Sequence, residues 1–406
     1  MSTETIFDKR PVATLLFITT ILIVILVLLL EVILRFTPYQ VFVSKGQGGF
    51  PPMFIADEKA GFDLAENYKG GVHSTVDLNY PVHTNNIGCF DKKAELNKKH
   101  NILIGDSFTW GFNPLKKKWT TILEKNTGER FLKCGVMAYG PEQALVKLKK
   151  VVDKVGETPK TIIYTYYWND LNDDHANTAL TAYKGSVVNR IKSFNYKNGH
   201  IEYLTDKDIA SNYEQYQEYG KTDYLSLNTT QRIKFWIKSH SIVANIIYNA
   251  LPSEVVEKQE DIAKGNEALY QTYLSKMSVT KYPWLEPAWD KHLKNIKRMA
   301  DYASAIDSHF MILILPTKAH VYPSHTSKET LKNLNTSKTR LITFLKKNSI
   351  QHLDLLKPFS KASIDGKNLY MPHDLHFSLE GEALTGELIT NFVKNNNFLI
   401  TKPKSK

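Results

Sequence analysis

Residues 101–109 read NILIGDSFT. The apolar run from Ile102 to Ile104 is continuous rather than alternating, which predicts a strand buried on both faces, as in a parallel sheet. Gly105 provides a turn, and Ser107 comes directly after the strand. Ligands of open parallel sheets bind at the carboxyl ends of the strands. We therefore expect the Ser107 hydroxyl at the rim of the sheet, with its main-chain amide near a helix N-terminus.

Further apolar runs share this character, and helical patterns alternate with them. The runs are residues 131–136, 161–168, 310–315 and, more weakly, 351–355. The helical patterns are residues 141–155, 284–305, 327–347 and 378–395. Strands that alternate with helices indicate βαβ units. The sequence therefore predicts an α/β fold with a doubly wound parallel sheet.

A long interruption, about residues 171–282, separates the third apolar run from the fourth. It contains the turn signal Asn198-Gly199-His200 ahead of residues 201–204, which predicts a small hairpin. An apolar stretch comes next at residues 235–248. Because a structureless loop of this length is unusual, we expect a folded insertion or a lid.

The N-terminal part carries an uncharged apolar run at residues 12–30, preceded by Lys9 and Arg10. The run is long enough to cross a bilayer, and the preceding charges favour a cytoplasmic N-terminus. We expect a cytoplasmic segment at residues 1–10 and an uncleaved transmembrane anchor at residues 11–36, with a cleaved signal peptide or a buried core helix as alternatives. Residues 37–79 read as a linker and irregular lead-in, residues 80–400 as the main domain, and residues 401–406 as a basic tail.

The bulk composition is that of a globular protein, with 42% hydrophobic and 23% charged residues and a net charge of +11. The basic residues are scattered, and no zinc-finger or RNP-like pattern accompanies them, so we expect no nucleic acid as a partner. Two cysteines, Cys89 and Cys134, are too few for a metal cage. One disulfide is possible in an oxidising compartment, but the expectation is two separate buried thiols.

Two further groups of polar residues fall at positions where catalytic residues would meet Ser107. Asn169 comes after the third strand, and its amide could donate to an oxyanion; its plain alternative is a helix N-cap. Asp374 and His376 share a short loop before the last helix. A histidine base oriented by a carboxylate is the partner that a serine nucleophile requires. Taken singly, each motif also fits an ordinary turn or surface loop.

Together, Ser107, Asn169 and the Asp374–His376 pair resemble the SGNH hydrolase family, also called GDSL-like. The resemblance covers residues 80–395 apart from the insertion, and residues 85–88 (NNIG) and 139–143 (YGPEQ) look like segments of membrane-anchored bacterial members. It implies a flavodoxin-like three-layer α/β/α sandwich. It also implies that Ser107 is the nucleophile and that the Ser107 amide, a glycine amide and the Asn169 side chain form the oxyanion hole.

The chain departs from the family pattern in three places. The position of the oxyanion-hole glycine aligns with Ala138, which can serve only if its backbone angles permit. The Asp-x-His spacing of Asp374 and His376 is tighter than in many GDSL lipases and looks more like the alginate-acetyltransferase-like branch. Thr109 stands where the Gly-x-Ser-x-Gly motif of α/β-hydrolases has its last glycine.

An acidic run and an aromatic run near the end of the third strand are weaker signals of function. Residues 170–174 (DLNDD) are acidic, but they lack the glycine and glutamate of a calcium loop, so we expect no metal. The tyrosines and tryptophan of residues 164–168 could stack on a sugar ring; burial in the sheet is the favoured alternative.

We therefore expect an ester hydrolase that acts on a cell-envelope glycan or lipid, with catalytic residues Ser107, Asp374 and His376 and an oxyanion hole of Ser107, Ala138 and Asn169. The alternatives are an O-acyltransferase of an exported polysaccharide and a non-catalytic glycan- or partner-binding module. The segment LPTK at residues 315–318 resembles glycan acetyltransferases and favours the transferase. We expect no cofactor. The expected partners are the inner membrane of a bacterium, an ester- or hydroxyl-bearing substrate outside the cytoplasm, and for a transferase a multipass acyl-donor protein.

Overall fold

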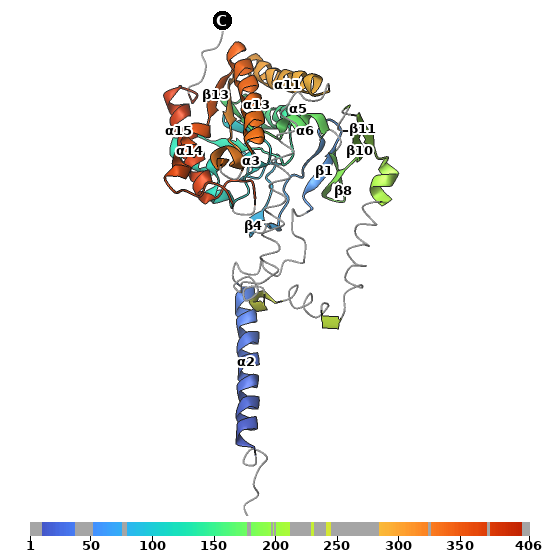
Figure 1. The fold of residues 1–406 in the computed structure, drawn as a ribbon, viewed down its shortest axis with the longest axis vertical. Coiled ribbons are helices and arrows are strands. Elements are labelled where there is room, and N and C mark those ends of the chain that lie inside the picture. The colour runs from blue at the N-terminus through green and yellow to red at the C-terminus, as the bar shows by residue number, and fades with distance from the viewer. Residues whose placement is uncertain are drawn as a thin grey trace, which may run out of the picture. The chain divides into compact units, whose positions relative to one another are not determined.

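The structure, a computed structural model (Figure 1), describes residues 10–36, 52–74, 79–176, 180–195, 198, 200–211, 229–230, 241–244, 284–323, 326–371 and 374–399. The chain forms two compact units. One comprises Met1–Gly48 and Tyr216–Glu260, and the other comprises Gly49–Gln215 and Asp261–Lys406.

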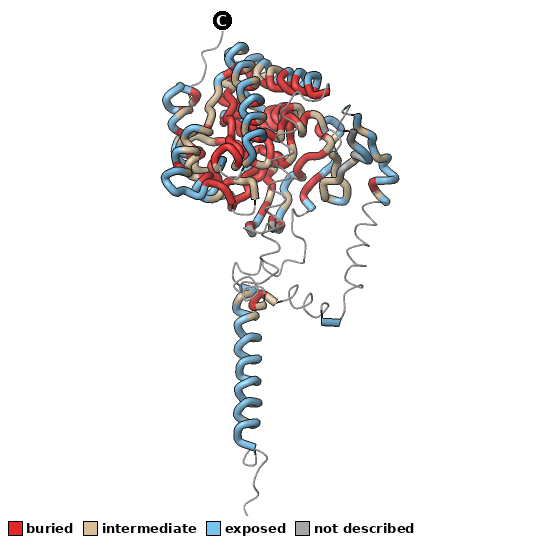
Figure 2. The backbone as a smooth tube through the Cα atoms, in the orientation of Figure 1, coloured by how far each residue is buried: buried red, intermediate tan, exposed pale blue. Residues whose placement is uncertain are grey.

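The first unit contains the helix α2 (Pro11–Arg35), which confirms the helix expected in this range. Its 25 residues are long and apolar enough to cross a membrane, and most of its side chains are exposed (Figure 2). Near its C-terminal end, the Glu31 carboxylate accepts hydrogen bonds from the Ser241 hydroxyl at 2.9 Å and from the main-chain amides of Ile242 at 3.0 Å and Val243 at 3.1 Å. A short piece of the insertion's apolar stretch is thus bound to the end of α2; the rest of residues 235–248 lies outside the described residues.

The second unit is built around a five-stranded parallel sheet with the strand order β13-β12-β7-β5-β6. The strands are β5 (Asn101–Gly105), β6 (Phe131–Lys133), β7 (Thr161–Tyr166), β12 (His309–Ile314) and β13 (Gln351–Asp354). All five correspond to the predicted apolar runs. Every residue of β5, β6 and β7 is buried, which confirms that these strands are covered on both faces.

Helices cover the two faces and complete the predicted three-layer α/β/α sandwich. Helix α4 packs on α15, and α5 packs on α11. The helices are α3 (Ser107–Trp110), α4 (Trp119–Thr127), α5 (Pro141–Val155), α6 (Asp170–Ala176), α11 (Leu285–Ala305), α12 (Lys318–Val321), α13 (Lys328–Lys347), α14 (Leu356–Ile364) and α15 (Leu379–Asn395), with a 3₁₀ turn at Leu115–Lys117. Ser327 caps α13 and Ser378 caps α15, as serine commonly does at helix N-termini.

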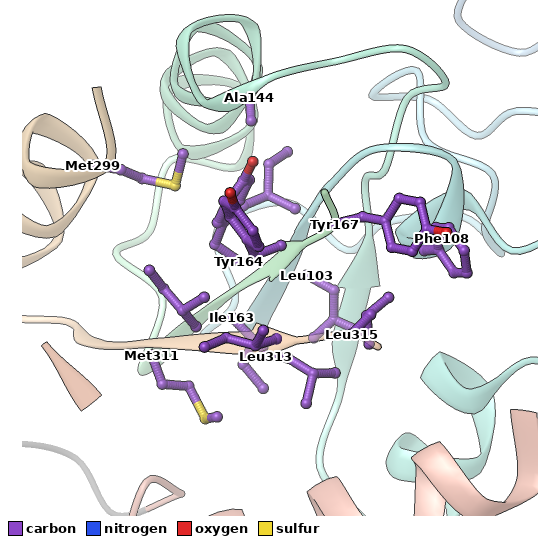
Figure 3. Close-up of a cluster of buried hydrophobic side chains, with 14 of the residues drawn as sticks. Leu103, Phe108, Ala144, Ile163, Tyr164, Tyr167, Met299, Met311, Leu313 and Leu315 are labelled. Carbon is purple, nitrogen blue, oxygen red and sulfur yellow. The ribbon is translucent and has the colours of Figure 1, made fainter. Parts of the chain in front are cut away.

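The core lies between the sheet and these helical layers, where the buried segments of Figure 2 gather. Figure 3 shows Leu103 from β5, Ile163 from β7 and Leu313 from β12 meeting across neighbouring strands. Ala144 of α5 and Met299 of α11 lie on the side of Tyr164, whose side chain points to the opposite face of the sheet from that of Ile163. Continuous apolar strands are therefore explained by burial on both faces.

In its described residues, the lead-in, which was expected to be irregular, contributes strands to two antiparallel hairpins. They are β1 (Phe54–Asp57) with β2 (Gly61–Leu64), and β3 (Gly71–Ser74) with β4 (Asn79–Val82). At the first turn, the Asp57 carboxylate accepts hydrogen bonds from the amides of Lys59 at 3.0 Å and Ala60 at 2.8 Å. Strands of four residues produce too little periodicity to stand out in a stretch rich in glycine and polar residues.

The insertion begins with α6 and continues as two hairpins. The expected hairpin around Asn198 is confirmed as β10 (Ile191–Asn195) paired with β11 (His200–Tyr203). A second one, β8 (Leu180–Tyr183) paired with β9 (Ser186–Asn189), was not predicted. Thr181 donates from its hydroxyl to the carbonyl of Gly61 at 3.1 Å, which attaches this hairpin to the lead-in.

Cys89 and Cys134 form a disulfide, which corrects the expectation of two separate thiols. Cys134 comes directly after β6, and its amide donates to the carbonyl of Leu103 in the neighbouring strand at 2.9 Å. The pairing depends on how the segment after β4 folds back beside β6. Spacing along the sequence contains no information about that contact.

Candidate active site

Ser107 lies at the carboxyl end of β5, as the first residue of α3. Gly105 has φ +149° there, and a Cβ at this position would come within 2.8 Å of the Thr165 carbonyl oxygen, so the chain needs glycine to turn so close to β7. The Asp106 carboxylate accepts a hydrogen bond from the Phe108 amide at 2.9 Å and fixes the start of α3. Among the residues that the structure describes, the main-chain N–H of Ser107 has no acceptor.

The structure brings together the three residues predicted to form the triad, although 269 positions separate Ser107 from His376. The Ser107 Oγ lies 2.8 Å from His376 Nε2. On the other side of the ring, Nδ1 is bonded to Asp374 Oδ1, and the His376 amide donates to the same carboxylate oxygen at 2.8 Å. In the tautomer with a proton on Nδ1, the ring donates to Asp374 and accepts from Ser107. This is the arrangement that a nucleophilic serine requires.

Three hydrogen bonds fix the loop that carries Asp374 and His376: one closes the loop itself, and two join it to another segment of the domain. The Met371 amide donates to the His376 carbonyl at 2.9 Å, and the Tyr370 hydroxyl donates to the carbonyl of Pro316 at 2.6 Å. Lys318 Nζ donates to the Met371 carbonyl at 3.0 Å. Pro316 and Lys318 belong to the LPTK segment, so this segment holds the loop in place.

The surroundings of Asp374 favour the ionised form of its carboxyl group. Burial opposes ionisation of this carboxyl, but the nearby His376 and its hydrogen bonds outweigh that effect and lower the pKa of Asp374 to about 2. The carboxylate therefore stays ionised at neutral pH, where it can stabilise an imidazolium on His376.

Two phenylalanines enclose the imidazole of His376. The Phe112 ring stacks on it with centroids 3.6 Å apart and an interplanar angle of 5°, and the Phe108 centroid lies 4.7 Å away at 38°. Phe112 also forms a T-shaped pair with His73, whose Nδ1 lies 2.7 Å from the Tyr80 hydroxyl. Burial, with a smaller contribution from the His376 charge, lowers the pKa of His73 to about 3, so His73 is neutral at physiological pH.

The three predicted oxyanion-hole residues come after three adjacent strands. Ser107 succeeds β5, Ala138 succeeds β6, and Asn169 succeeds β7. Asn169 Nδ2 donates to Asp173 Oδ2 at 2.7 Å, which orients the amide nitrogen. A carboxamide nitrogen has two hydrogens, so one remains to donate elsewhere. Their placement at one edge of the sheet fits the predicted role, which stays a proposal.

Ala138 has φ +59°, a left-handed conformation that side chains rarely adopt. Although alanine stands here in place of the family's glycine, Ala138 thus keeps the left-handed backbone conformation that favours glycine. Alanine tolerates this conformation at a cost of about 1 kcal/mol, whereas a β-branched residue fits it poorly.

We therefore expect Ala138→Val to lower kcat/KM for an aryl acetate about tenfold to a hundredfold and to reduce the free energy of unfolding by about 1–2 kcal/mol. Ala138→Gly, the matched control, should keep its activity within about threefold. Steady-state kinetics and thermal unfolding measure both. Full activity of a folded Ala138→Val variant would show that this amide takes no part.

The acidic run after β7 has structural partners. The Tyr164 hydroxyl donates to Asp170 at 2.5 Å, and burial raises the pKa of Asp170 well above its usual range. Asp174 lies 2.9 Å from His292 Nδ1. The aromatics of this segment are buried too: Trp168, for example, donates from Nε1 to the Leu315 carbonyl at 3.0 Å.

Sequence reasoning missed the residues that hold the site rather than react. Phe112 and Asp173 contact the predicted site residues directly. Asp173 lies four residues after Asn169, the spacing of neighbours on a helix, so this contact had a sequence signal. Phe112 had none, because its contact with His376 depends on the tertiary fold.

Comparison with known proteins agrees with this geometry. Residues 279–406, which include Asp374 and His376, match the family model described as "SGNH hydrolase-like domain, acetyltransferase AlgX". The resemblance to the SGNH family and to its alginate-acetyltransferase-like branch is thereby confirmed. No curated protein sequence matches the chain.

Three solved structures to which the chain is similar are described as an esterase, a lipase or a lipolytic protein. They are a putative lipolytic protein of the G-D-S-L family from Desulfitobacterium hafniense (13% identity, 73% of this chain and 99% of that one, TM-score 0.33), the acetyl xylan esterase AlAXEase (10%, 73% and 100%, 0.37), and a lipase/acylhydrolase from Enterococcus faecalis (12%, 76% and 100%, 0.34).

Proposed function

We propose that this SGNH hydrolase-like chain is a serine-dependent enzyme of acyl transfer, in the first place an ester hydrolase that acts on a cell-envelope glycan or lipid. The observation that supports it most is the linked arrangement of Ser107, His376 and Asp374, with 2.8 Å between the serine Oγ and the histidine Nε2. A nucleophile, a base and an orienting carboxylate in hydrogen-bond contact make a sufficient set for this chemistry.

In the first half-reaction, Ser107 Oγ attacks the ester carbonyl carbon while His376 Nε2 takes the hydroxyl proton. Asp374 stabilises the resulting imidazolium through Nδ1. The tetrahedral oxyanion is bound by the amides of Ser107 and Ala138 and by the Asn169 side chain. The carbon–oxygen bond of the alcohol then breaks, and His376 returns the proton to the leaving oxygen, which leaves an acyl group on Ser107.

The second half-reaction repeats these steps with a new acceptor. Water, or a sugar hydroxyl in the case of a transferase, gives its proton to His376 Nε2 and attacks the acyl carbonyl. When the intermediate collapses, the bond to Ser107 Oγ breaks and the serine regains a proton from His376. Nothing in this scheme needs a cofactor or a metal.

We further propose that α2 is a single-pass anchor in the inner membrane of a bacterium and that residues 45–406 lie outside the cytoplasm. Lys9 and Arg10 before the apolar run support this orientation. The disulfide between Cys89 and Cys134 gives independent support, because such bonds persist mainly in oxidising compartments. A transferase would also need an acyl donor, which a multipass membrane partner could supply.

The second candidate is an O-acetyltransferase of an exported polysaccharide. The match of residues 279–406 to an AlgX-type acetyltransferase model favours it, as does the short Asp-x-His spacing. The triad alone does not separate the two reactions, since both pass through the same acyl-enzyme.

The hydrolase and the transferase differ in the acceptor of the acyl group, which is water for the first and a glycan hydroxyl for the second. Full-length protein in detergent is given an aryl acetate with a ¹³C-labelled acetyl group, with and without cell-envelope polysaccharides, and mass spectrometry tracks the label. Label that appears only as free acetate with every glycan supports the hydrolase, and label on glycan hydroxyls supports the transferase. If no label leaves the donor and no acyl group appears on Ser107, the enzyme proposal fails and a binding module remains.

A further inference from the structure

A cavity of about 330 Å³ opens beside Ala138, one of the proposed oxyanion donors. Its lining comes from three separate segments of the domain: Phe54 and Phe62 from the β1–β2 hairpin, Met137 and Ala138 from the loop after β6, and Ser186 and Val187 from the β8–β9 hairpin. The lead-in and the insertion, neither of which belongs to the central sheet, thus provide two of its walls.

These walls are packed in place. The Phe54 amide donates to the Gly185 carbonyl at 3.1 Å, which ties the lead-in strand to the turn of the insertion hairpin. Glycine is required at Gly61, because a Cβ there would come within 2.1 Å of the Leu180 carbonyl oxygen. Behind the cavity, the Tyr139 hydroxyl donates to the Phe62 carbonyl. The cavity is therefore a built feature of the fold.

The chemistry of the lining is apolar. Phe54 and Phe62 meet edge to face with centroids 5.8 Å apart, and Met137 and Val187 add aliphatic surface. The Ser186 hydroxyl is the single polar side-chain group among the six lining residues. A sugar ring bound here would leave most of its hydroxyls without partners. A hydrocarbon chain would lose water contact at no such cost.

We propose that this cavity binds the acyl chain of the substrate and that the chain is longer than acetyl. The inference rests on the acyl-transfer function proposed above and adds the class of acyl group. If the Ala138 amide holds the oxyanion, the substituent on the acyl carbon begins next to the cavity. An apolar cavity of about 150 Å³ holds benzene, so the present volume suits a chain of about four to eight carbons.

The test compares p-nitrophenyl acetate, butyrate and hexanoate with full-length protein in detergent. We expect kcat/KM of the wild type to rise with chain length, by up to about fourfold for each methylene buried. Val187→Trp, which fills the cavity, should lower the ratio of kcat/KM for hexanoate to that for acetate at least about tenfold. Tyr183→Trp, the matched control, places the same side chain in the same hairpin outside the lining and should keep the wild-type ratio.

A second measurement separates this proposal from the proposed function. Saturation-transfer NMR with sodium hexanoate and the Ser107→Ala protein detects binding without turnover, and Val187→Trp in that background should abolish the signal. If the wild type and Val187→Trp both turn over the esters with the same ratio of kcat/KM for hexanoate to kcat/KM for acetate, the acyl site is wrong. The esterase proposal would then still stand. Absence of turnover with any ester, but hexanoate binding that Val187→Trp abolishes, would overturn the esterase and retain the site.

Discussion

Replacing Ser107 with alanine is expected to lower kcat/KM for p-nitrophenyl acetate by at least about 10⁴-fold. The alanine has no oxygen to form the acyl-enzyme, so His376 loses the group from which it takes a proton. The serine hydroxyl is hydrogen-bonded to His376, whereas the start of its helix is fixed by Asp106 and by glycine at the turn. Removing the hydroxyl should therefore leave the fold unchanged.

The control for this experiment is Ser304→Ala, which removes an exposed hydroxyl from α11 and should keep full activity. Thermal unfolding must show both variants folded. Activity of folded Ser107→Ala equal to that of the wild type would eliminate Ser107 as the nucleophile.

Asp374→Asn should reduce kcat/KM for the same ester by about 10⁴-fold. The asparagine amide would present hydrogens to His376 Nδ1, so the ring would adopt the tautomer that places its proton on Nε2. It could then no longer accept the proton of Ser107. Asparagine is close in size and shape to aspartate, so the loop geometry should be retained.

The lowered pKa of Asp374 also leads to a prediction of how the free energy of unfolding depends on pH. Its folded pKa of about 2 lies below the unfolded value of 3.8, so its contribution to stability is present above pH 3.8 and lost as the pH falls toward 2. The difference in the free energy of unfolding between wild type and Asp374→Asn should shrink over that window. Ser304→Ala, which changes no titratable group, is the control and should show no such change. A pH-independent difference for Asp374→Asn would contradict the assigned ionisation.

The central sheet and the proposed catalytic residues could be predicted because both leave local signals. The five strands are apolar runs, and their parallel order places the loops after β5, β6 and β7 at one edge of the sheet. Ser107 and Asn169 therefore stand out by their positions, and the resemblance to the SGNH family supplied the roles expected of them. Asp374 and His376 could be found because they share one loop.

The remaining features depend on contacts between distant segments. The left-handed angle of Ala138, the stacking of Phe112 on His376 and the two lead-in hairpins are set by tertiary packing. In the sequence, alanine at position 138 is a departure from the family's glycine, and only its backbone angle shows why alanine is accepted. The cavity beside it was beyond prediction, since three separate segments build it.

The disulfide between Cys89 and Cys134 closes a covalent ring of chain that contains Ser107 and the whole of β5. For a separation of 45 residues, closing such a ring removes chain entropy from the unfolded state worth about 4 kcal/mol. That is a large share of the stability of a typical domain. While its thiols are reduced, the chain is therefore easier to unfold, which suits the proposed export. If Ser107 is the nucleophile and the chain is exported, as proposed, oxidation outside the cytoplasm then commits the segment that bears Ser107 to its folded form.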